Sequence, residues 1–258
     1  MCFYFAIVKT KATSLVKNKV LTESQLSLFE EKHFVSGFDH PLMPVIGNDE
    51  SDKIQMFRWG LVPKYTNSME AADKFVNQYN TLNAKSETVF TSRLYSEPVK
   101  RKRCLVLCSG FFEWRHKEPG KAKTEKYPFY ITLKNNELFV FAGIWEAFTD
   151  RNTGEIVKTF SILTTSANSM METIHNSKKR MPVIIEPERA LEWLNPDLGE
   201  KEIQSFLKPY DVQKMKARTI RKINPRIPGL AGNPTVTAYY YYPELAEVLG
   251  DDRFEKGE

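Results

Sequence analysis

The chain has 258 residues, of which 41% are hydrophobic and 27% are charged, an ordinary composition for a globular protein. Its 37 Lys and Arg residues outnumber 32 Asp and Glu residues, and the net charge of +5 permits a polyanionic partner without identifying one. Three cysteines, at positions 2, 104 and 108, exclude a disulfide framework, and no apolar stretch is long enough to span a membrane. We therefore expect a soluble, cytoplasmic protein.

Taken in chain order, the sequence predicts strands separated by short helices. Residues 2–8 are rich in aromatic and β-branched residues and are typical of a strand. Residues 22–25 match a capping box, and the short amphipathic helix that it opens would bury Leu26, Phe29 and Phe34. Further strands are expected at residues 54–59, 104–108, 129–133, 138–144 and 159–163. Further short helices are expected at residues 87–92, 169–174, 188–194 and 203–207.

This order of elements indicates the fold class. Strands that follow one another with only short helices between them argue against a doubly wound α/β sheet. We expect one compact, β-rich α+β domain over residues 1–250, with largely antiparallel sheets, short peripheral helices and a monomeric state. The charged residues 251–258 would be a frayed tail. As a strand, the tyrosines at 239–242 would bury two rings and expose two, which favours a core-and-surface role over a stacking platform.

The residue after the initiator methionine is the most informative single position. Aminopeptidases that remove Met1 prefer a small second residue, so a mature chain would begin at Cys2. Such a terminus carries a thiol beside an α-amine, whose pKa is roughly 7.7–8.0. The amine can form a Schiff base with an aldehyde, and the thiol can then close a thiazolidine ring. Taken alone, however, a cysteine at position 2 is more often incidental.

Four further segments gain meaning when they are considered together with Cys2. They are Trp59-Gly-Leu-Val-Pro63, Asn83-Ala-Lys-Ser-Glu-Thr88, Cys108-Ser-Gly-Phe-Phe-Glu-Trp114, and Thr164-Thr-Ser-Ala-Asn168, which continues to Ile174-His175 and Arg180-Met-Pro-Val-Ile-Ile185. Each motif is weak alone. In this order after an N-terminal Met-Cys, they resemble the SRAP family, the SOS response-associated peptidase domain, over about seven-tenths of the chain.

The resemblance implies a compact β-rich domain with a channel leading to the N-terminal cysteine. It implies a protein that binds single-stranded DNA and bonds covalently to abasic sites, with Cys2 as the nucleophile after Met1 is removed. A ring-opened abasic site exposes an aldehyde, which suits an amine–thiol terminus. An associated strand-cleaving lyase activity is compatible with this chemistry, and no cofactor is implied.

Two further residues are expected to transfer protons. Glu113 lies between aromatic residues, where burial would let its carboxyl group exchange protons near neutral pH, and the resemblance gives it that role. The alternative is a strand-end glutamate paired with a lysine. His175 matches a family motif and would pass a proton to the sugar, or else be a structural histidine. The other histidines, at positions 33, 40 and 116, match no motif, and the four histidines together do not indicate a metal site.

The remaining motif residues are expected to hold the DNA. By the resemblance, Asn83 would position the Cys2 amine or the sugar, and Arg180 would contact a phosphate. Lys85 stands where the family usually has arginine, so it keeps the charge but loses the bidentate geometry. Trp59 and Trp114 would stack on bases or wall the pocket, although both are equally compatible with an ordinary core position.

Some features depart from the family pattern or lie outside it. Phe3 replaces a glycine found in many members, and residues 176–179 add length between His175 and Arg180. The basic run at residues 100–103 is either a solvated turn or a DNA contact, and the weaker run at 214–222 is less informative.

Two other functions compete with abasic-site crosslinking. A cysteine-type peptidase would use Cys2 as a thiolate with His175 and Glu113 in a triad-like arrangement, and removal of its own Met1 is one cut that it would make. A noncovalent binding module would hold single-stranded DNA through the basic runs and the tryptophans, without any role for Cys2.

Overall fold

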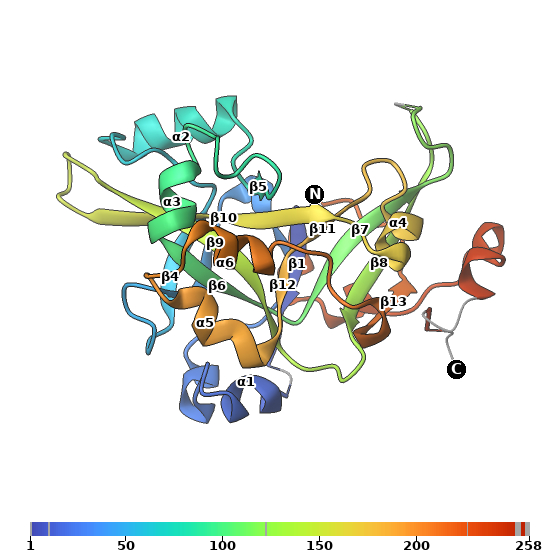
Figure 1. Ribbon diagram of the computed structural model, residues 1–258. Coiled ribbons are helices and arrows are strands. Elements are labelled where there is room, and N and C mark those ends of the chain that lie inside the picture. Colours follow the sequence, from blue (N-terminus) through green and yellow to red (C-terminus); the bar gives the residue numbers. More distant parts are fainter. Residues whose placement is uncertain (1, 10, 122, 226, 251–253, 256–258) are drawn as a thin grey trace.

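The computed structural model describes the whole chain except residues 1, 10, 122, 226, 251–253 and 256–258 (Figure 1). Its strands, in chain order, are β1 (Tyr4–Ile7), β2 (Lys32–Ser36), β3 (Leu42–Gly47), β4 (Gln55–Trp59), β5 (Asn83–Lys85), β6 (Arg103–Cys108), β7 (Gly110–His116), β8 (Lys126–Leu133), β9 (Phe139–Thr149), β10 (Ile156–Ser166), β11 (Arg180–Pro182), β12 (Ile184–Ile185) and β13 (Met215–Thr219). Its α-helices are α1 (Thr13–Lys17), α2 (Met69–Gln78), α3 (Ser96–Arg101), α4 (Ser169–Ile174), α5 (Ala190–Leu194) and α6 (Glu200–Phe206). Short 3-10 turns complete the described chain.

The strands form two sheets. The first has the order β13-β8-β7-β1-β2, and every neighbouring pair in it is antiparallel. In the second, β10, β4, β3, β6 and β9 close into a ring, because β10 pairs with β4 along one edge and with β9 along the other. Only the pairings of β10 with β4 and β5 are parallel there. The prediction of a β-rich α+β fold with largely antiparallel sheets is confirmed, and the helices lie around the sheets (Figure 1).

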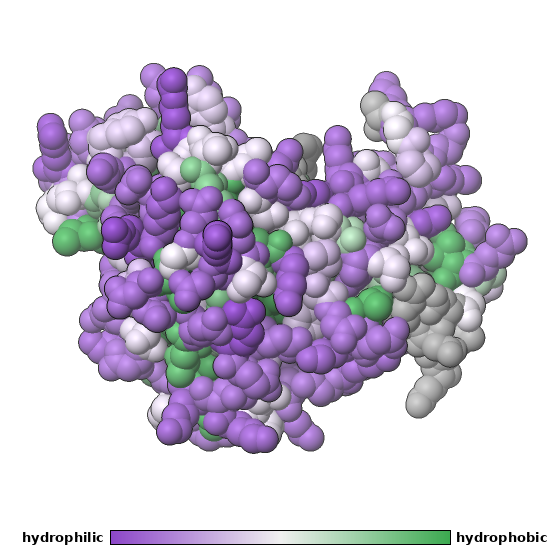
Figure 2. All heavy atoms as spheres, viewed as in Figure 1, coloured by the Kyte–Doolittle hydropathy of each residue, from purple (hydrophilic) through white to green (hydrophobic). Residues whose placement is uncertain are grey.

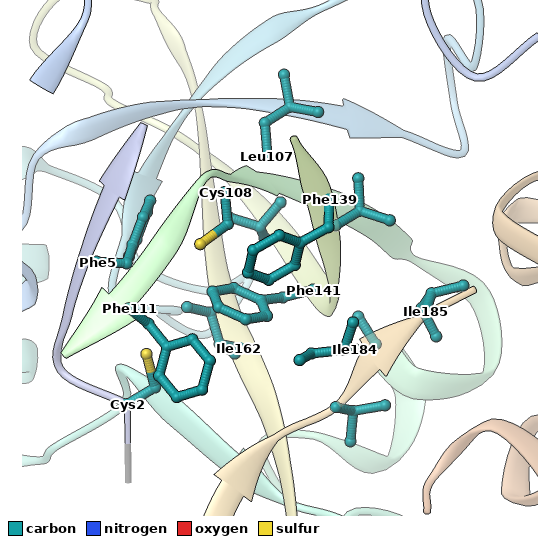
Figure 3. Packing of buried hydrophobic residues seen from close by; sticks show 14 of the residues in the cluster. Cys2, Phe5, Leu107, Cys108, Phe111, Phe139, Phe141, Ile162, Ile184 and Ile185 are labelled. Carbon is teal, nitrogen blue, oxygen red and sulfur yellow. The ribbon is translucent and has the colours of Figure 1, made fainter. Parts of the chain in front are cut away.

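An aromatic core joins the sheets at β1. Phe5 packs against Trp59 with ring centroids 5.0 Å apart and against Phe141 at 6.1 Å. Strand β1 of the first sheet therefore packs directly against β4 and β9 of the second sheet. This cluster also contains all three free thiols, those of Cys2, Cys104 and Cys108, and Figure 3 shows the part of it around Cys2 and Cys108. The face in Figure 2 is mostly hydrophilic with small apolar groups, and among the described residues no helix is long and apolar enough to cross a membrane.

Several predicted elements differ in the structure. Residues 87–92 form successive turns instead of a helix, because hydroxyl-bearing and β-branched residues there favour local turns. The predicted capping box is present, but the helix that it opens is a 3-10 helix that ends at Ser27. Phe34 therefore lies outside this helix, on β2. The tyrosines at 239–242 do not form a strand beyond a single bridge at Tyr239, and only Tyr242 among them is fully buried.

The chain end is partly anchored. Of the tail expected to fray, only Phe254 and Glu255 lie within the described residues. Phe254 is buried and bridges to Ala217 of β13, while Glu255 forms ion pairs with Lys216 and Arg218. At these two positions burial and charge pairing hold the chain, so the expectation of fraying does not apply there. The other six residues of that tail lie outside the described residues.

Candidate active site

The first strand and its neighbours bring three predicted catalytic residues together, namely Cys2, Glu113 and His175. Cys2 stands directly before β1, and β1 pairs with β7, which carries Glu113. His175 ends α4, a helix whose first turn is capped by the side chain of Asn168 and which packs against β7. Residues far apart in the sequence therefore meet beside β1.

The Cys2 thiol is buried and protonated. Its Sγ–H donates to the carbonyl oxygen of Tyr4 at 3.8 Å, and the side chain has no exposed surface. Burial raises the pKa of the Cys2 thiol far above its ordinary value, and the negative charge of Glu113 raises it further. The sulfur lies at the edge of the apolar cluster in Figure 3. In this environment Cys2 is held as a neutral thiol rather than as a thiolate.

His175 and Glu113 form a buried pair. Nδ1 of His175 lies 2.9 Å from the carbonyl oxygen of Arg180 and 3.8 Å from Oε1 of Glu113. Because a carbonyl oxygen only accepts, Nδ1 carries the proton, and Nε2 of the neutral ring is left as an acceptor. Burial lowers the pKa of His175, although Glu113 opposes this shift. At neutral pH the ring is therefore suited to accept a proton at Nε2.

Acidification is expected to weaken the fold through His175. An unfolded histidine has a pKa of about 6.5, and the folded value is lower, so the unfolded state binds more protons. The free energy of unfolding should therefore fall as the pH drops below about 6.5. Urea denaturation at about pH 7.5 and about pH 5.5 measures this loss, and His175→Gln should reduce it. An equal loss in that variant would assign the effect to other groups, such as His116, whose pKa burial also lowers.

Asn83 presents an amide without a partner. It lies on β5 opposite Ile162 of β10, and its side chain is almost completely buried. Among the described residues, neither Oδ1 nor Nδ2 has a hydrogen-bond partner. A buried amide left in this state costs stability, and such groups are frequent where a ligand later supplies the partner. Asn83 is thus available to bind a polar group.

Arg180 is engaged within the protein, whereas Lys85 is exposed. The Arg180 guanidinium donates to the Thr164 carbonyl oxygen at 2.7 Å and forms an ion pair with Glu87. Burial raises the pKa of Glu87, but the opposing contact with Arg180 prevails and lowers it overall. Lys85 lies beside Thr164 in the register of β5 and β10. A phosphate approaching here would meet Lys85 directly and would have to compete with Glu87 for Arg180.

The two tryptophans occupy different environments. Trp59 is fully buried, donates its Nε1–H to the Leu82 carbonyl oxygen at 2.9 Å and stacks on Phe160. Its ring has no exposed face on which a base could stack. Trp59 is therefore a core residue and not a DNA contact. Trp114 is half-buried on β7, with its ring centroid 5.0 Å from that of Tyr4.

A pocket of about 410 Å³ lies over the buried pair. Its walls combine Glu113 and His175 with aromatic and basic side chains: Phe3, Tyr4, Trp114, His116, Lys126 and Lys178. The extra residues after His175 help to shape it, because the Asn176 side chain exchanges two hydrogen bonds with the backbone of His116, at 2.8 and 2.9 Å. His116, which matches no family motif, lies at the end of β7 and lines this pocket. Residues two apart on a strand point to the same face, so the position of His116 two residues after Trp114 was the feature of the sequence that could have placed both at one pocket.

The basic run at residues 100–103 does not line this pocket. Arg103 is fully buried, Lys102 forms an ion pair with Glu146, and only Arg101 is fully exposed. The hypothesis that this run contacts DNA therefore fails for Arg103, because its guanidinium is used inside the fold.

Comparison with known proteins identifies the family. The family model described as SOS response associated peptidase (SRAP) matches residues 1–224. The chain belongs to the SRAP family. The abasic site processing protein YoqW of Bacillus subtilis is 34% identical over 183 residues, which are 70% of this chain and 75% of that protein. The abasic site processing protein HMCES of Xenopus tropicalis is 29% identical over 62% of this chain and 50% of its own length.

The fold is also that of a solved structure. A crystal structure of a protein from Bacteroides thetaiotaomicron is 37% identical, with a TM-score of 0.77 over 93% of this chain and the whole of that chain. The SRAP match ends at residue 224, so the segment that follows, with Tyr242 and Phe254 packed onto the first sheet, lies beyond the matched region.

Proposed function

We propose that this SRAP protein binds single-stranded DNA and forms a covalent thiazolidine crosslink between Cys2 and abasic sites, after removal of Met1. The single observation that carries the proposal is that the buried Glu113–His175 pair lines a pocket with basic walls, while the charge of Glu113 acts on the buried Cys2 thiol. The names of two relatives, which are abasic site processing proteins, support the choice of substrate. The crosslink would shield the damaged strand.

The proposed reaction is a condensation. The free α-amine of Cys2 attacks C1′ of the ring-opened sugar, and loss of one water leaves an imine. The Cys2 sulfur then adds to the imine carbon, and the thiol proton ends on the nitrogen, which closes the ring. Because burial keeps the sulfur protonated, the amine is the stronger nucleophile and reacts first. At the imine stage, β-elimination of the 3′ phosphate is a competing outcome, which is the proposed lyase activity.

Two side chains have proton-transfer roles in this scheme. Glu113, whose charge is felt at Cys2, would take the proton from the sulfur as it attacks the imine. Nε2 of the neutral His175 ring would accept the proton of the C1′ hydroxyl and pass it to the ring oxygen as the sugar ring opens. The unpartnered amide of Asn83 would hold the sugar or the amine, since it offers both donors and an acceptor.

Basic side chains would attract the DNA backbone. Lys126 and Lys178 line the pocket, and Lys85 is exposed beside Arg180 and Thr164. Their contacts with phosphates would be independent of sequence and weaken as salt is added. Trp114 would supply an aromatic wall next to the sugar.

The peptidase alternative has less support from the geometry. A cysteine peptidase needs a thiolate activated by a histidine, whereas the Cys2 thiol donates to the Tyr4 carbonyl and its pKa is raised. Incubation with unrelated peptides tests this alternative: cleavage that depends on Cys2 would favour it.

Mixing the processed protein with single-stranded DNA that carries one abasic site tests the proposal directly. Denaturing electrophoresis should show a heat-stable shifted band with this DNA and none with intact DNA, while mass spectrometry verifies that Met1 is absent. Absence of the band from correctly processed protein would refute the crosslinking function and leave noncovalent binding.

Glu113→Gln is expected to slow crosslink formation about 100-fold, because the amide preserves the shape of the side chain but cannot take up a proton. The rate is measured from the time course of the shifted band at saturating protein. Glu172→Gln is the matched control, since it changes an exposed glutamate on α4. An unchanged rate in Glu113→Gln would remove Glu113 from the mechanism.

A further inference from the structure

A second hollow adjoins the pocket over Glu113 and His175, which we call the Cys2 pocket because its lining residue Phe3 follows Cys2 in the chain. It has a volume of about 560 Å³ and is lined by Tyr4, Ser36, Phe38, Asp39, Asn224 and Pro225. Tyr4 and Pro225 also line the Cys2 pocket, so the two hollows share a wall. We name the second one the side hollow. A DNA strand seated with one sugar at Cys2 would place a neighbouring nucleotide close to it.

Two of the residues that line the side hollow, Tyr4 and Phe38, are aromatic. The Phe38 side chain is 52% exposed, although its ring packs at 5.0 Å from Phe3 and at 5.9 Å from Tyr4. These contacts hold the Phe38 ring in place and leave part of it open to solvent. A fixed, open ring is suited to stack on a planar group, and every nucleobase has such a face.

The charge of the side hollow differs from that of the Cys2 pocket. Lys126 and Lys178 line the Cys2 pocket, whereas among the described residues no lysine, arginine or histidine lines the side hollow. Its ionisable group is instead the carboxylate of Asp39, which is exposed and has no ion pair within the described part of the chain. A phosphate would be repelled there, so the side hollow suits a base and the Cys2 pocket suits the backbone.

Asp39 also discriminates between bases. An ionised carboxylate only accepts hydrogen bonds, and adenine, cytosine and guanine each carry an exocyclic amino group that donates. Thymine has no amino group, and its one donor, N3–H, lies between two carbonyl oxygens that would face the carboxylate unfavourably. In an unpaired strand these edges are free to be read.

We propose that the side hollow binds the nucleobase next to the abasic residue, with Phe38 stacking on it and Asp39 accepting a hydrogen bond from its amino group. The protein would therefore prefer abasic sites that are flanked, on one side, by adenine, cytosine or guanine over thymine. This inference rests on the proposed function and adds a substrate preference to it.

Crosslinking rates on a set of single-stranded oligonucleotides test the preference. Each carries one abasic site, and the base on the 5′ or the 3′ side is varied in turn, with protein below saturation. We expect rates that depend on the base at one flank only, with thymine about fivefold slower than the other three. Asp39→Asn should abolish this difference, whereas Asp197→Asn, an exposed change of the same charge, should preserve it.

Stacking is tested separately with Phe38→Ala. We expect about tenfold slower crosslinking on base-flanked sites, and no change when a baseless spacer replaces the nucleotide at the sensitive flank. Leu28→Ala, which removes another exposed apolar side chain, is the matched control. Equal rates for all bases at both flanks, or a preference unchanged in Asp39→Asn, would overturn the inference.

Noncovalent binding provides a second readout that does not need the adduct. Fluorescence anisotropy of the Cys2→Ala variant with the same oligonucleotides should show the same order of affinities. Failure of all crosslinking with this order retained would refute the proposed function while supporting the base subsite. Crosslinking without any dependence on the flanking base in either readout would support the proposed function and refute the base subsite.

Discussion

The Cys2→Ala variant is expected to yield no heat-stable adduct with abasic DNA, a loss of at least about 1000-fold in adduct formation relative to the native sequence. The terminal amine that remains still forms an imine, but no sulfur is present to close the ring, and an imine hydrolyses on heating. Quantitative denaturing gels before and after heating measure the effect. Trapping the imine with borohydride should recover a band from the variant, which shows that it still binds and reacts at the first step.

Cys104→Ala is the matched control for this loss, because Cys104 is another buried free thiol, located on β6. It should retain the adduct. Cys2→Ser tests the sulfur itself, since the hydroxyl has the same position and a much weaker nucleophilicity. A heat-stable adduct from Cys2→Ala would contradict the thiazolidine mechanism.

The Arg103→Ala variant is expected to lose on the order of 3–5 kcal/mol of unfolding free energy. Arg103 is fully buried, and its guanidinium donates to the carbonyl oxygens of Trp193 at 2.8 Å, Val99 at 3.0 Å, Lys100 at 2.7 Å and Asn195. These bonds fasten the end of α3 and the end of α5 to β6. Alanine would leave these carbonyl oxygens without donors and would create a cavity between them. Burial lowers the pKa of Arg103 to about 10, so the guanidinium remains charged at neutral pH.

Urea denaturation followed by circular dichroism measures this loss. Arg101→Ala, which changes an exposed arginine two positions earlier, should alter the unfolding free energy by less than about 0.5 kcal/mol. Arg103→Lys should fall between them, because a lysine reaches fewer carbonyls than the planar fork does. A loss below about 1 kcal/mol in Arg103→Ala would mean that the site relaxes around the missing side chain.

The strands were predictable because their signal is local. The apolar run that contains Cys104 and Cys108 forms β6, and the helix expected at residues 169–174 forms α4. Helix α2 was missed because it buries only Ala72 and Val76, which is too narrow an apolar stripe to stand out in the sequence. The closure of β10 onto β4 and β9 depends on long-range pairing, which local patterns do not encode.

The candidate site was predictable only where a motif named its residues. Glu113 and His175 were expected near Cys2, and the structure places them together. The buried roles of Trp59 and Arg103 were not foreseeable from composition, because the same residue types occur on surfaces and in cores. The contribution of Tyr4, Lys126 and Pro225 to the pocket walls arises from the packing of separate elements and has no signature in the sequence.

The position of β1 has a mechanical consequence for the proposed adduct. Any pull on a crosslinked DNA strand would enter the protein at Cys2, directly before β1. That strand is bonded to β2 on one edge and to β7 on the other, and Phe5 packs against rings from the second sheet. The force would therefore be shared by two ladders of hydrogen bonds and by the core. A motor that moves along the DNA would have to separate β1 from the middle of the first sheet before the protein unfolded from its N-terminus.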